Sequence, residues 1–205
     1  MRKCVITIAR GYGSGGKTIG QIIARNLGIP FYDRDLLYLA SEDSGINIDL
    51  FGKMDETVKK GIFNPLSDKY EGGLIPPESN AFVSDKNLFN YQAKIIKELA
   101  DKESCVIVGR CADFVLSDRT DVVKVFVWAP YEDCVKNVMD ITLVSEKEAR
   151  RRIKEIDAHR SAYYRYYTAN NWDDVHNYDL CINSSSLGFE KSAVLIASYG
   201  DIKFE

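Results

Sequence analysis

An eight-residue segment near the start of the chain, GYGSGGKT at positions 11–18, constrains the fold more than any other feature. It fits the pattern GxxxxGK followed by Ser or Thr, comes after the strand-like letters VITIA and precedes the helix-like letters TIGQIIARNLG. Glycines let backbone amides point at a phosphate chain without a Cβ in the way, and the following helix adds the positive end of its dipole. The segment predicts a phosphate-binding loop between the first strand and the first helix of an α/β domain.

The residues of this loop predict ATP and Mg²⁺ as ligands. Lys17 is expected to reach the β- and γ-phosphates and to act in catalysis, and the Thr18 hydroxyl is expected to bind the Mg²⁺ that bridges them. The remaining loop residues are expected to hold the donor phosphates: Gly11, Gly13, Ser14, Gly15 and Gly16.

Apolar runs bounded by turn residues alternate with amphipathic patterns along the chain. The runs predict strands at 5–9, 29–32, 105–108, 122–128 and 178–182. The amphipathic patterns predict helices at 18–26, 88–101, 131–139 and 145–167, the last long enough to break near its middle, and a terminal helix at 191–199 on the sheet edge. Continuous apolar strands are typical of a sheet covered on both faces, and their alternation with helices implies parallel crossovers. One α/β domain over residues 1–205 is expected.

The segment from 44 to 87 differs in composition from the rest. It contains three of the five prolines, Pro65, Pro76 and Pro77, together with several glycines and few apolar periods. Two interpretations fit it: a mobile insertion or small flap, and a long structured loop.

Charged residues follow two of the predicted strands, where the carboxyl ends of parallel strands face a ligand crevice. Asp33 is expected to orient Mg²⁺-bound water or to act as a base, with Asp35 on the acceptor side. Arg110 follows the third predicted strand, and its guanidinium can bind a phosphate through two nitrogens. The alternatives are a solvated loop whose Asp caps a helix starting near Leu36, and a surface Arg paired with Asp113.

The segment from 150 to 165 is basic and aromatic, which suits a helix that compensates phosphate charge during phosphoryl transfer. Arg151 and Arg160 are the candidate catalytic arginines, with Arg165 as a third phosphate contact. The alternative is a solvated helix face, in which neighbouring carboxylates pair with the arginines at helical spacing. Those carboxylates are Glu146, Glu148 and Glu155.

Composition argues against several other classes. The 27 basic and 30 acidic side chains give a net charge of -3, so no strong positive field favours nucleic acid or a membrane as partner. Five scattered cysteines and two histidines, with no CxxC pair, argue against a disulfide framework or a zinc centre. No apolar run is long enough to span a bilayer, and the opening residues lack a secretory leader pattern. A cytoplasmic location is expected.

Five sequence blocks, in their order and spacing, resemble the cytidylate kinase-like branch of the P-loop nucleoside monophosphate kinases over about residues 3–188. The blocks are GYGSGGKT, FYDRDLL, CVIVGRCADFVL, EIDAHRSAYYRYYTANNW and YDLCINSSSLG. The resemblance implies a three-layer P-loop fold with a five-stranded parallel sheet of order 2-3-1-4-5. It also implies an acceptor-binding flap at 44–87 and an arginine-bearing lid at about 140–152.

The resemblance also implies roles for individual residues. Arg110 matches an arginine that holds the acceptor phosphate. Asp157 and Arg160 match a D-x-x-R pattern in the helix after the lid, whose Arg reaches phosphates; Asp157 is expected to bind the substrate. Asn183 opens a loop, 183–186, that resembles the resting place of the adenine ring.

The acceptor side departs from the family pattern. Authentic cytidylate kinases typically have Asp-Gly-Arg-Asp after the third strand, whereas Val108 and Cys111 flank Gly-Arg in this chain. Leu39 stands where that family has an arginine for the acceptor. The donor half of the pattern is kept and the acceptor half is rewritten.

These features favour ATP- and Mg²⁺-dependent phosphoryl transfer to a small acceptor, first of all a nucleoside monophosphate such as CMP or dCMP. The alternative is a P-loop ATP-binding protein that has a non-nucleotide acceptor or has lost catalysis. A GTPase-like switch is disfavoured, because the sequence contains neither N/T-K-x-D nor a D-x-x-G after the third predicted strand.

Overall fold

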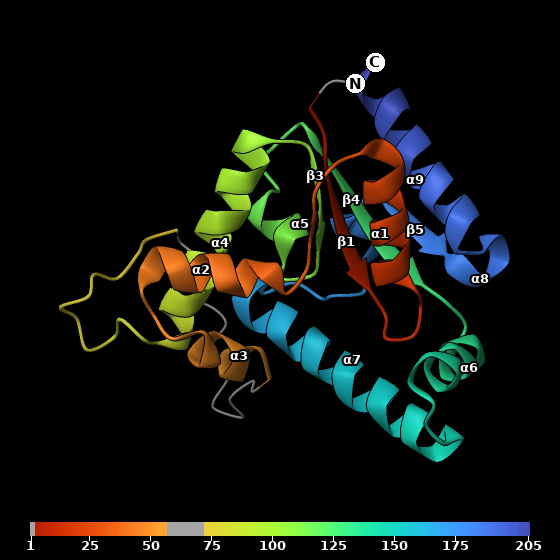
Figure 1. Cartoon of the computed structure of the whole chain (residues 1–205), viewed down its shortest axis with the longest axis horizontal. Coiled ribbons are helices and arrows are strands. Elements are labelled where there is room, and N and C mark those ends of the chain that lie inside the picture. The colour runs from red at the N-terminus through yellow and green to blue at the C-terminus, as the bar shows by residue number, and fades with distance from the viewer. Residues whose placement is uncertain (1–2, 57–71) are drawn as a thin grey trace.

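The computed structural model describes residues 3–56 and 72–205 of the chain. Within these residues, five strands form one sheet in which every neighbouring pair is parallel. The strands are β1 (Val5–Arg10), β2 (Phe31–Tyr32), β3 (Cys105–Val108), β4 (Val122–Trp128) and β5 (Leu180–Asn183). Their order is β2-β3-β1-β4-β5, which confirms the expected sheet and its order (Figure 1).

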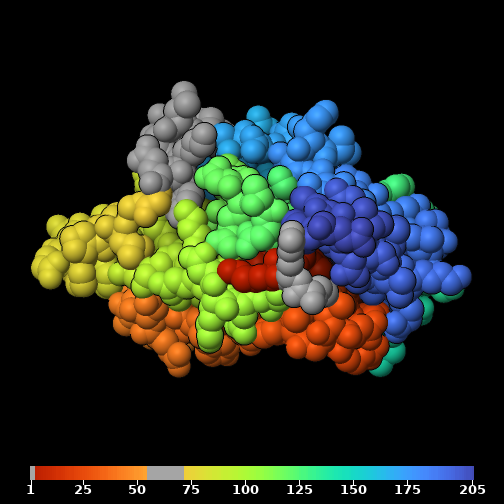
Figure 2. All heavy atoms as spheres, turned by 90° about the horizontal axis from the view of Figure 1, so that it is seen from above, coloured from red at the N-terminus to blue at the C-terminus, as the bar shows by residue number. Residues whose placement is uncertain are grey.

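The central strand, β1, is apolar on both faces. Ile6 and Ile8 belong to the buried cluster on one face of the sheet, and Val5 belongs to the cluster on the other. β1 pairs with β3 on one side and with β4 on the other, starting at the same residue, Val5. In Figure 2 the start of β1 is a narrow red strip enclosed by green, orange and violet segments that lie far apart in the sequence.

Helices cover both faces of the sheet, as expected for a three-layer α/β fold. One cluster joins the sheet to α1 (Gly16–Leu27) and α9 (Phe189–Phe204). The opposite cluster joins it to α2 (Asp35–Ser44), α3 (Ile48–Glu56), α4 (Asp85–Lys102), α5 (Ala112–Val115) and α7 (Glu146–Thr168). The remaining elements are α6 (Tyr131–Thr142), which packs against the start of α7, the 3-10 helix η1 (Val175–Asn177) and α8 (Ser184–Leu187). The terminal helix α9 packs on α1 and the sheet face rather than on the sheet edge.

The helix α7 is continuous over 23 residues, so the expected break is wrong. Its sequence contains neither glycine nor proline, the residues that most often interrupt a helix. Ser145 caps its start by accepting a hydrogen bond from the Glu148 amide at 3.3 Å. An unbroken α7 connects the segment expected to form a lid, near its first turn, to the cavity described below, near its centre.

The described parts of the segment from 44 to 87 are tied to the core. The sequence did not predict α3, yet Phe51 is fully buried and Met54 is nearly so. Asn87 is also fully buried, and its amide group binds the backbone of Ile75 and of Phe82. The expected flap has its centre at 57–71, outside the described residues, so the flap stays a prediction.

In the ranges 3–56 and 72–205, no helix is both long enough and apolar enough to cross a membrane.

The buried Asn87 generates a test of how the segment before α4 is held. Asn87→Ala removes the side-chain oxygen that accepts from the Ile75 amide and the side-chain nitrogen that donates to the Ile75 and Phe82 carbonyls, at 2.8–3.2 Å. We expect the free energy of unfolding to fall by about 1–3 kcal/mol, because buried groups lose their partners. Chemical unfolding followed by circular dichroism measures the change. The control Asn26→Ala, at an exposed position of α1, should leave stability within about 0.5 kcal/mol of wild type.

Candidate active site

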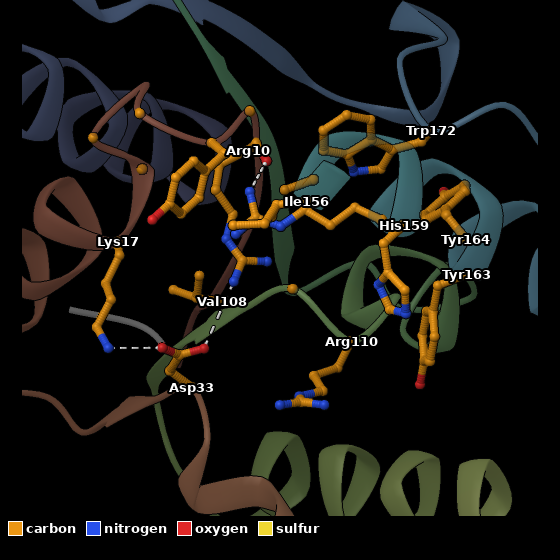
Figure 3. Close-up of a pocket in the computed structure, with 18 of the residues that line it drawn as sticks. Arg10, Lys17, Asp33, Val108, Arg110, Ile156, His159, Tyr163, Tyr164 and Trp172 are labelled. Carbon is orange, nitrogen blue, oxygen red and sulfur yellow. Dashed lines mark hydrogen bonds and ion pairs between the residues drawn. The ribbon is translucent and has the colours of Figure 1, made fainter. Parts of the chain in front are cut away.

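A cavity of about 880 Å³ opens at the carboxyl ends of β1, β2 and β3. Its walls come from the β1–α1 loop, the end of β2, the β3–α5 loop, the end of α6 and the middle of α7 (Figure 3). The sequence predicted this sheet edge, because parallel strands bring their carboxyl ends together.

The phosphate-binding loop has the backbone shape that the glycine pattern predicted. Gly13 and Gly15 have positive φ angles of 85° and 79°. A Cβ at Gly13 would lie 2.6 Å from the Cys134 carbonyl oxygen, so only glycine fits there. Ser14 is buried, and its hydroxyl donates to the Gly11 carbonyl at 2.9 Å, which makes it a structural residue of the loop.

Three hydrogen bonds from separate elements hold the loop. The Ser184 hydroxyl, in α8, donates to the Ser14 carbonyl at 2.7 Å, and the Asn137 amide, in α6, donates to the Gly13 carbonyl at 2.9 Å. The Tyr12 amide donates to Asp157 Oδ1, in α7, at 2.8 Å.

Asp157 was expected to contact the substrate; it is not among the residues that line the cavity, and its Oδ1 accepts the hydrogen bond from the Tyr12 amide. Burial raises the pKa of Asp157 above the ordinary value, and the Tyr12 amide and the charges of Arg160 and Arg10 oppose that rise. The hydrogen bond from the Tyr12 amide to Asp157 connects the loop to α7.

Lys17 and Asp33 form an ion pair in the cavity, with 2.9 Å between Nζ and Oδ2. The other carboxylate oxygen of Asp33 lies 3.7 Å from Nη2 of Arg10. Burial acts to raise the pKa of Asp33, but the hydrogen bond from Lys17 and the charges of Arg10, Lys17 and Arg110 outweigh it and lower the pKa. Asp33 is therefore anionic at neutral pH. The sequence analysis missed Arg10, which directly precedes the glycine motif.

The turn after β3 directs Arg110 toward the cavity (Figure 3). Three consecutive residues have left-handed backbones: Gly109 at φ 78°, Arg110 at 60° and Cys111 at 53°. For residues with a Cβ this conformation costs about 1–2 kcal/mol each, and such strain is typical of functional sites. Backbone hydrogen bonds from Gly109 to Ile8 and from Ala112 to Gly109 hold the turn.

The two candidate arginines of α7 have different surroundings. Arg160 lines the cavity, donates to the Arg10 carbonyl at 3.1 Å and lies over the Tyr12 ring at 5.6 Å. Arg151 is half-exposed and outside the cavity wall, where it pairs with Glu148 and Glu155. Its environment matches the solvated helix face that the glutamate spacing allowed.

The other expected residues also divide into those that line the cavity and those that do not. Thr18 lies in the cavity wall beside Lys17. Asp35 is exposed in the first turn of α2, and Asn183 caps α8 by accepting from the Ser185 amide at 3.1 Å; neither lines the cavity. In the described part of the chain, no group of three or more His, Cys, Asp or Glu side chains comes together as a metal site.

A buried carboxyl group in the cavity wall, Asp113, was named in the sequence analysis only in the alternative in which it pairs with Arg110. It is 4% exposed, and Tyr164 donates a hydrogen bond to it at 2.6 Å. Burial raises the pKa of Asp113 to about 6, against the Tyr164 hydroxyl, backbone amides and the charge of Lys124, which lower it. This group links α5 to α7 behind Arg110.

The fold, the loop and the cavity define a P-loop kinase. The profile of the cytidylate kinase-like family matches residues 5–186, and the chain belongs to that family. No curated protein matches the sequence. The flap and lid that the resemblance implied stay predictions.

Solved structures share the fold. An uncharacterized protein from Eubacterium ventriosum ATCC 27560 superposes with a TM-score of 0.72 at 26% identity, over 97% of this chain and 99% of its own. Shikimate kinase from Bacteroides thetaiotaomicron superposes with a TM-score of 0.54 at 14% identity, over 98% of this chain and 99% of its own.

The raised pKa of Asp113 predicts a pH dependence of stability. Its value of about 6 exceeds the ordinary 3.8, so from about pH 4 to 6 the folded state binds more protons than the unfolded state. The contribution of Asp113 to stability should therefore fall as pH rises through this window, by on the order of 3 kcal/mol. Asp113→Asn should remove that contribution to the slope, as measured against wild type by urea unfolding across the window. The exposed control Asp118→Asn should keep it, and equal slopes in all three proteins would contradict the assignment.

Proposed function

We propose that this chain transfers the γ-phosphoryl group of ATP to a small anionic acceptor, with a nucleoside monophosphate such as CMP or dCMP as the first candidate. One observation carries the proposal: the phosphate-binding loop and an acceptor-side arginine, Arg110, line the same cavity. The wall holds five cationic side chains, against three carboxylates, Asp33, Asp113 and Glu155. The cations are Arg10, Lys17, Arg34, Arg110 and Arg160. A cavity of positive charge in a chain of net charge -3 suits anionic ligands on both sides.

The residues present fit Mg²⁺ bound together with ATP. Thr18 supplies a hydroxyl and Asp33 an anionic carboxylate in the same wall, and Mg²⁺ in nucleotide sites takes only one or two protein groups besides phosphates and water. When bound, Mg²⁺ would neutralise charge on the β- and γ-phosphates.

The protein groups have separate tasks in this proposal. Backbone amides of the loop and the start of α1 hold the donor phosphates. Lys17 stabilises the negative charge of the γ-phosphate during transfer. Asp33, whose pKa is lowered, is a weak base, so its task is to position Lys17 and metal-bound water. A phosphate acceptor is already ionised at neutral pH and needs no base, which agrees with this role. Arg160 holds the loop, and Arg110 binds the acceptor anion.

Two features of the acceptor side bear on the substrate. Tyr163, Tyr164 and Trp172 add aromatic surface to the wall, which supports a planar base in the acceptor. Val108 and Cys111 also line the wall, at the positions where cytidylate kinases carry acids. That replacement supports a second candidate, an anionic acceptor that is not a nucleotide.

Lys17 provides the first test of the proposal. Lys17→Ala should lower acceptor-dependent ADP production at least about 10²-fold, because a preorganised cation at the developing charge is lost. The coupled assay uses ATP, Mg²⁺ and a panel of CMP, dCMP, UMP, AMP, GMP and small hydroxylated acids. The control Lys191→Ala, on the exposed face of α9, should keep the wild-type rate. Full activity in Lys17→Ala would refute the site.

Arg110 provides a test of the acceptor side alone. Arg110→Ala should raise the KM for the acceptor about 10- to 100-fold, the cost of a charge-assisted hydrogen bond, while the KM for ATP stays the same. Steady-state kinetics with each substrate varied in turn measures both constants. An equal rise in the KM for ATP would place Arg110 with the donor instead.

A further inference from the structure

The last residue of β1, Arg10, places a cation at the centre of the cavity without belonging to the glycine motif. Its side chain is 18% exposed and lines the wall between Lys17 and Arg110. Figure 3 shows its guanidinium directed toward Asp33, whose other carboxylate oxygen faces Lys17. Neither the loop pattern nor the resemblance assigned it a role.

Two glycines form a slot for this side chain. A Cβ at Gly16 would lie 2.5 Å from Cβ and 3.0 Å from Cγ of Arg10. A Cβ at Gly109 would contact the guanidinium, 3.1 Å from Cζ and closer still to Nη1. The stem of Arg10 thus passes over the start of α1, and its head group lies on the turn after β3. A side chain at Gly16 or at Gly109 would therefore occupy the space that the Arg10 side chain takes.

The charges around Arg10 place its head group beside the carboxylate that binds Lys17. Asp33 binds Lys17 through Oδ2 at 2.9 Å and faces Arg10 through Oδ1 at 3.7 Å. Lys17 and Arg10 therefore each face a different oxygen of the Asp33 carboxylate. Lys17 belongs to the donor phosphates, and Arg10, which lies on Gly109, is on the side of the acceptor turn. In the proposed function, a phosphoryl group moving from the donor side to the acceptor side would pass between them.

The two candidate arginines of α7 make other contacts. Arg151, the arginine expected from the lid, pairs on the surface with Glu148 and Glu155. Arg160 donates to the Arg10 carbonyl at 3.1 Å, which fixes the backbone that carries the Arg10 side chain.

We propose that Arg10 is a catalytic residue that donates hydrogen bonds to the oxygens of the transferred phosphoryl group. This inference rests on the proposed function. The bond between the γ-phosphorus and the bridging oxygen breaks, ADP leaves with the electron pair, and an acceptor oxygen bonds to the phosphorus. Arg10 stays protonated throughout and compensates charge on the equatorial oxygens, which the loose transition state spreads among them. Its planar fork can reach two of those oxygens together.

The test separates transition-state contact from binding. Arg10→Met keeps much of the stem and removes the charge, and we expect kcat to fall about 10²- to 10³-fold while the KM for ATP and the Kd for ADP change less than about twofold. Arg10→Lys should recover only part of the rate, because lysine lacks the fork. The control Arg25→Met, at an exposed site 3.8 Å from Glu190, should match wild type.

Chemical rescue excludes a purely structural role. Added guanidinium ion, at concentrations that leave the protein folded, should raise the kcat of Arg10→Ala and leave the kcat of Lys17→Ala unchanged. Unchanged kcat in Arg10→Met, or a loss confined to the KM for ATP, would overturn the proposal. So would a lost rate in Arg10→Ala that guanidinium does not restore.

A second measurement separates this inference from the proposed function. The affinity for ADP with Mg²⁺ and aluminium fluoride, a mimic of the transferred group, is measured by calorimetry in wild type and Arg10→Met. Wild type should bind ADP more tightly with the fluoride, and Arg10→Met should lose that gain. A gain kept by Arg10→Met would overturn the role of Arg10 alone. A wild type with neither turnover nor gain would overturn phosphoryl transfer, and the role of Arg10 with it.

Discussion

The site depends on the pairing of β1 with a parallel neighbour on each side. Because β3 and β4 both start their registers at Val5, the strands end close together at one edge of the sheet. The phosphate-binding loop continues β1 at that edge, and the turn of Arg110 continues β3. The backbone geometry of the sheet therefore brings together the loop and the turn to which we assign the donor and the acceptor. A register shift in either ladder would move one half of the cavity away from the other.

Electrostatics at that edge centres on Asp33. Its carboxylate faces Lys17 and Arg10, two cations that would otherwise repel each other in a partly buried site. The lowered pKa of Asp33 means that this negative charge persists at neutral pH. Donor phosphates bring several negative charges to the same place, so Lys17 can exchange one anionic partner for another with little loss of electrostatic energy. The arrangement of Lys17, Asp33 and Arg10 thereby suits an anionic ligand such as phosphate.

The sequence predicted the parts of the structure that local patterns determine. The loop at 11–18, the strands and the position of Arg110 follow from glycine spacing and apolar runs, and the sheet order followed from the family resemblance. Arg10 and Asp113 were missed because their roles arise from contacts with Gly109 and Tyr164, which are distant in sequence. The sequence also left open whether the α7 arginines pair on the surface, since helical spacing allows both outcomes.

The rewritten acceptor turn changes what the cavity can recognise. Where cytidylate kinases carry two acids around Gly-Arg, this chain has Val108 and Cys111, both buried. The nearest carboxyl group in the turn, Asp113, is buried and accepts a hydrogen bond from Tyr164. The turn therefore has apolar side chains in place of two acids and keeps the positive charge of Arg110, beside Arg10. In the proposed function, such a surface would select an acceptor by its anionic group more than by amino groups on a base.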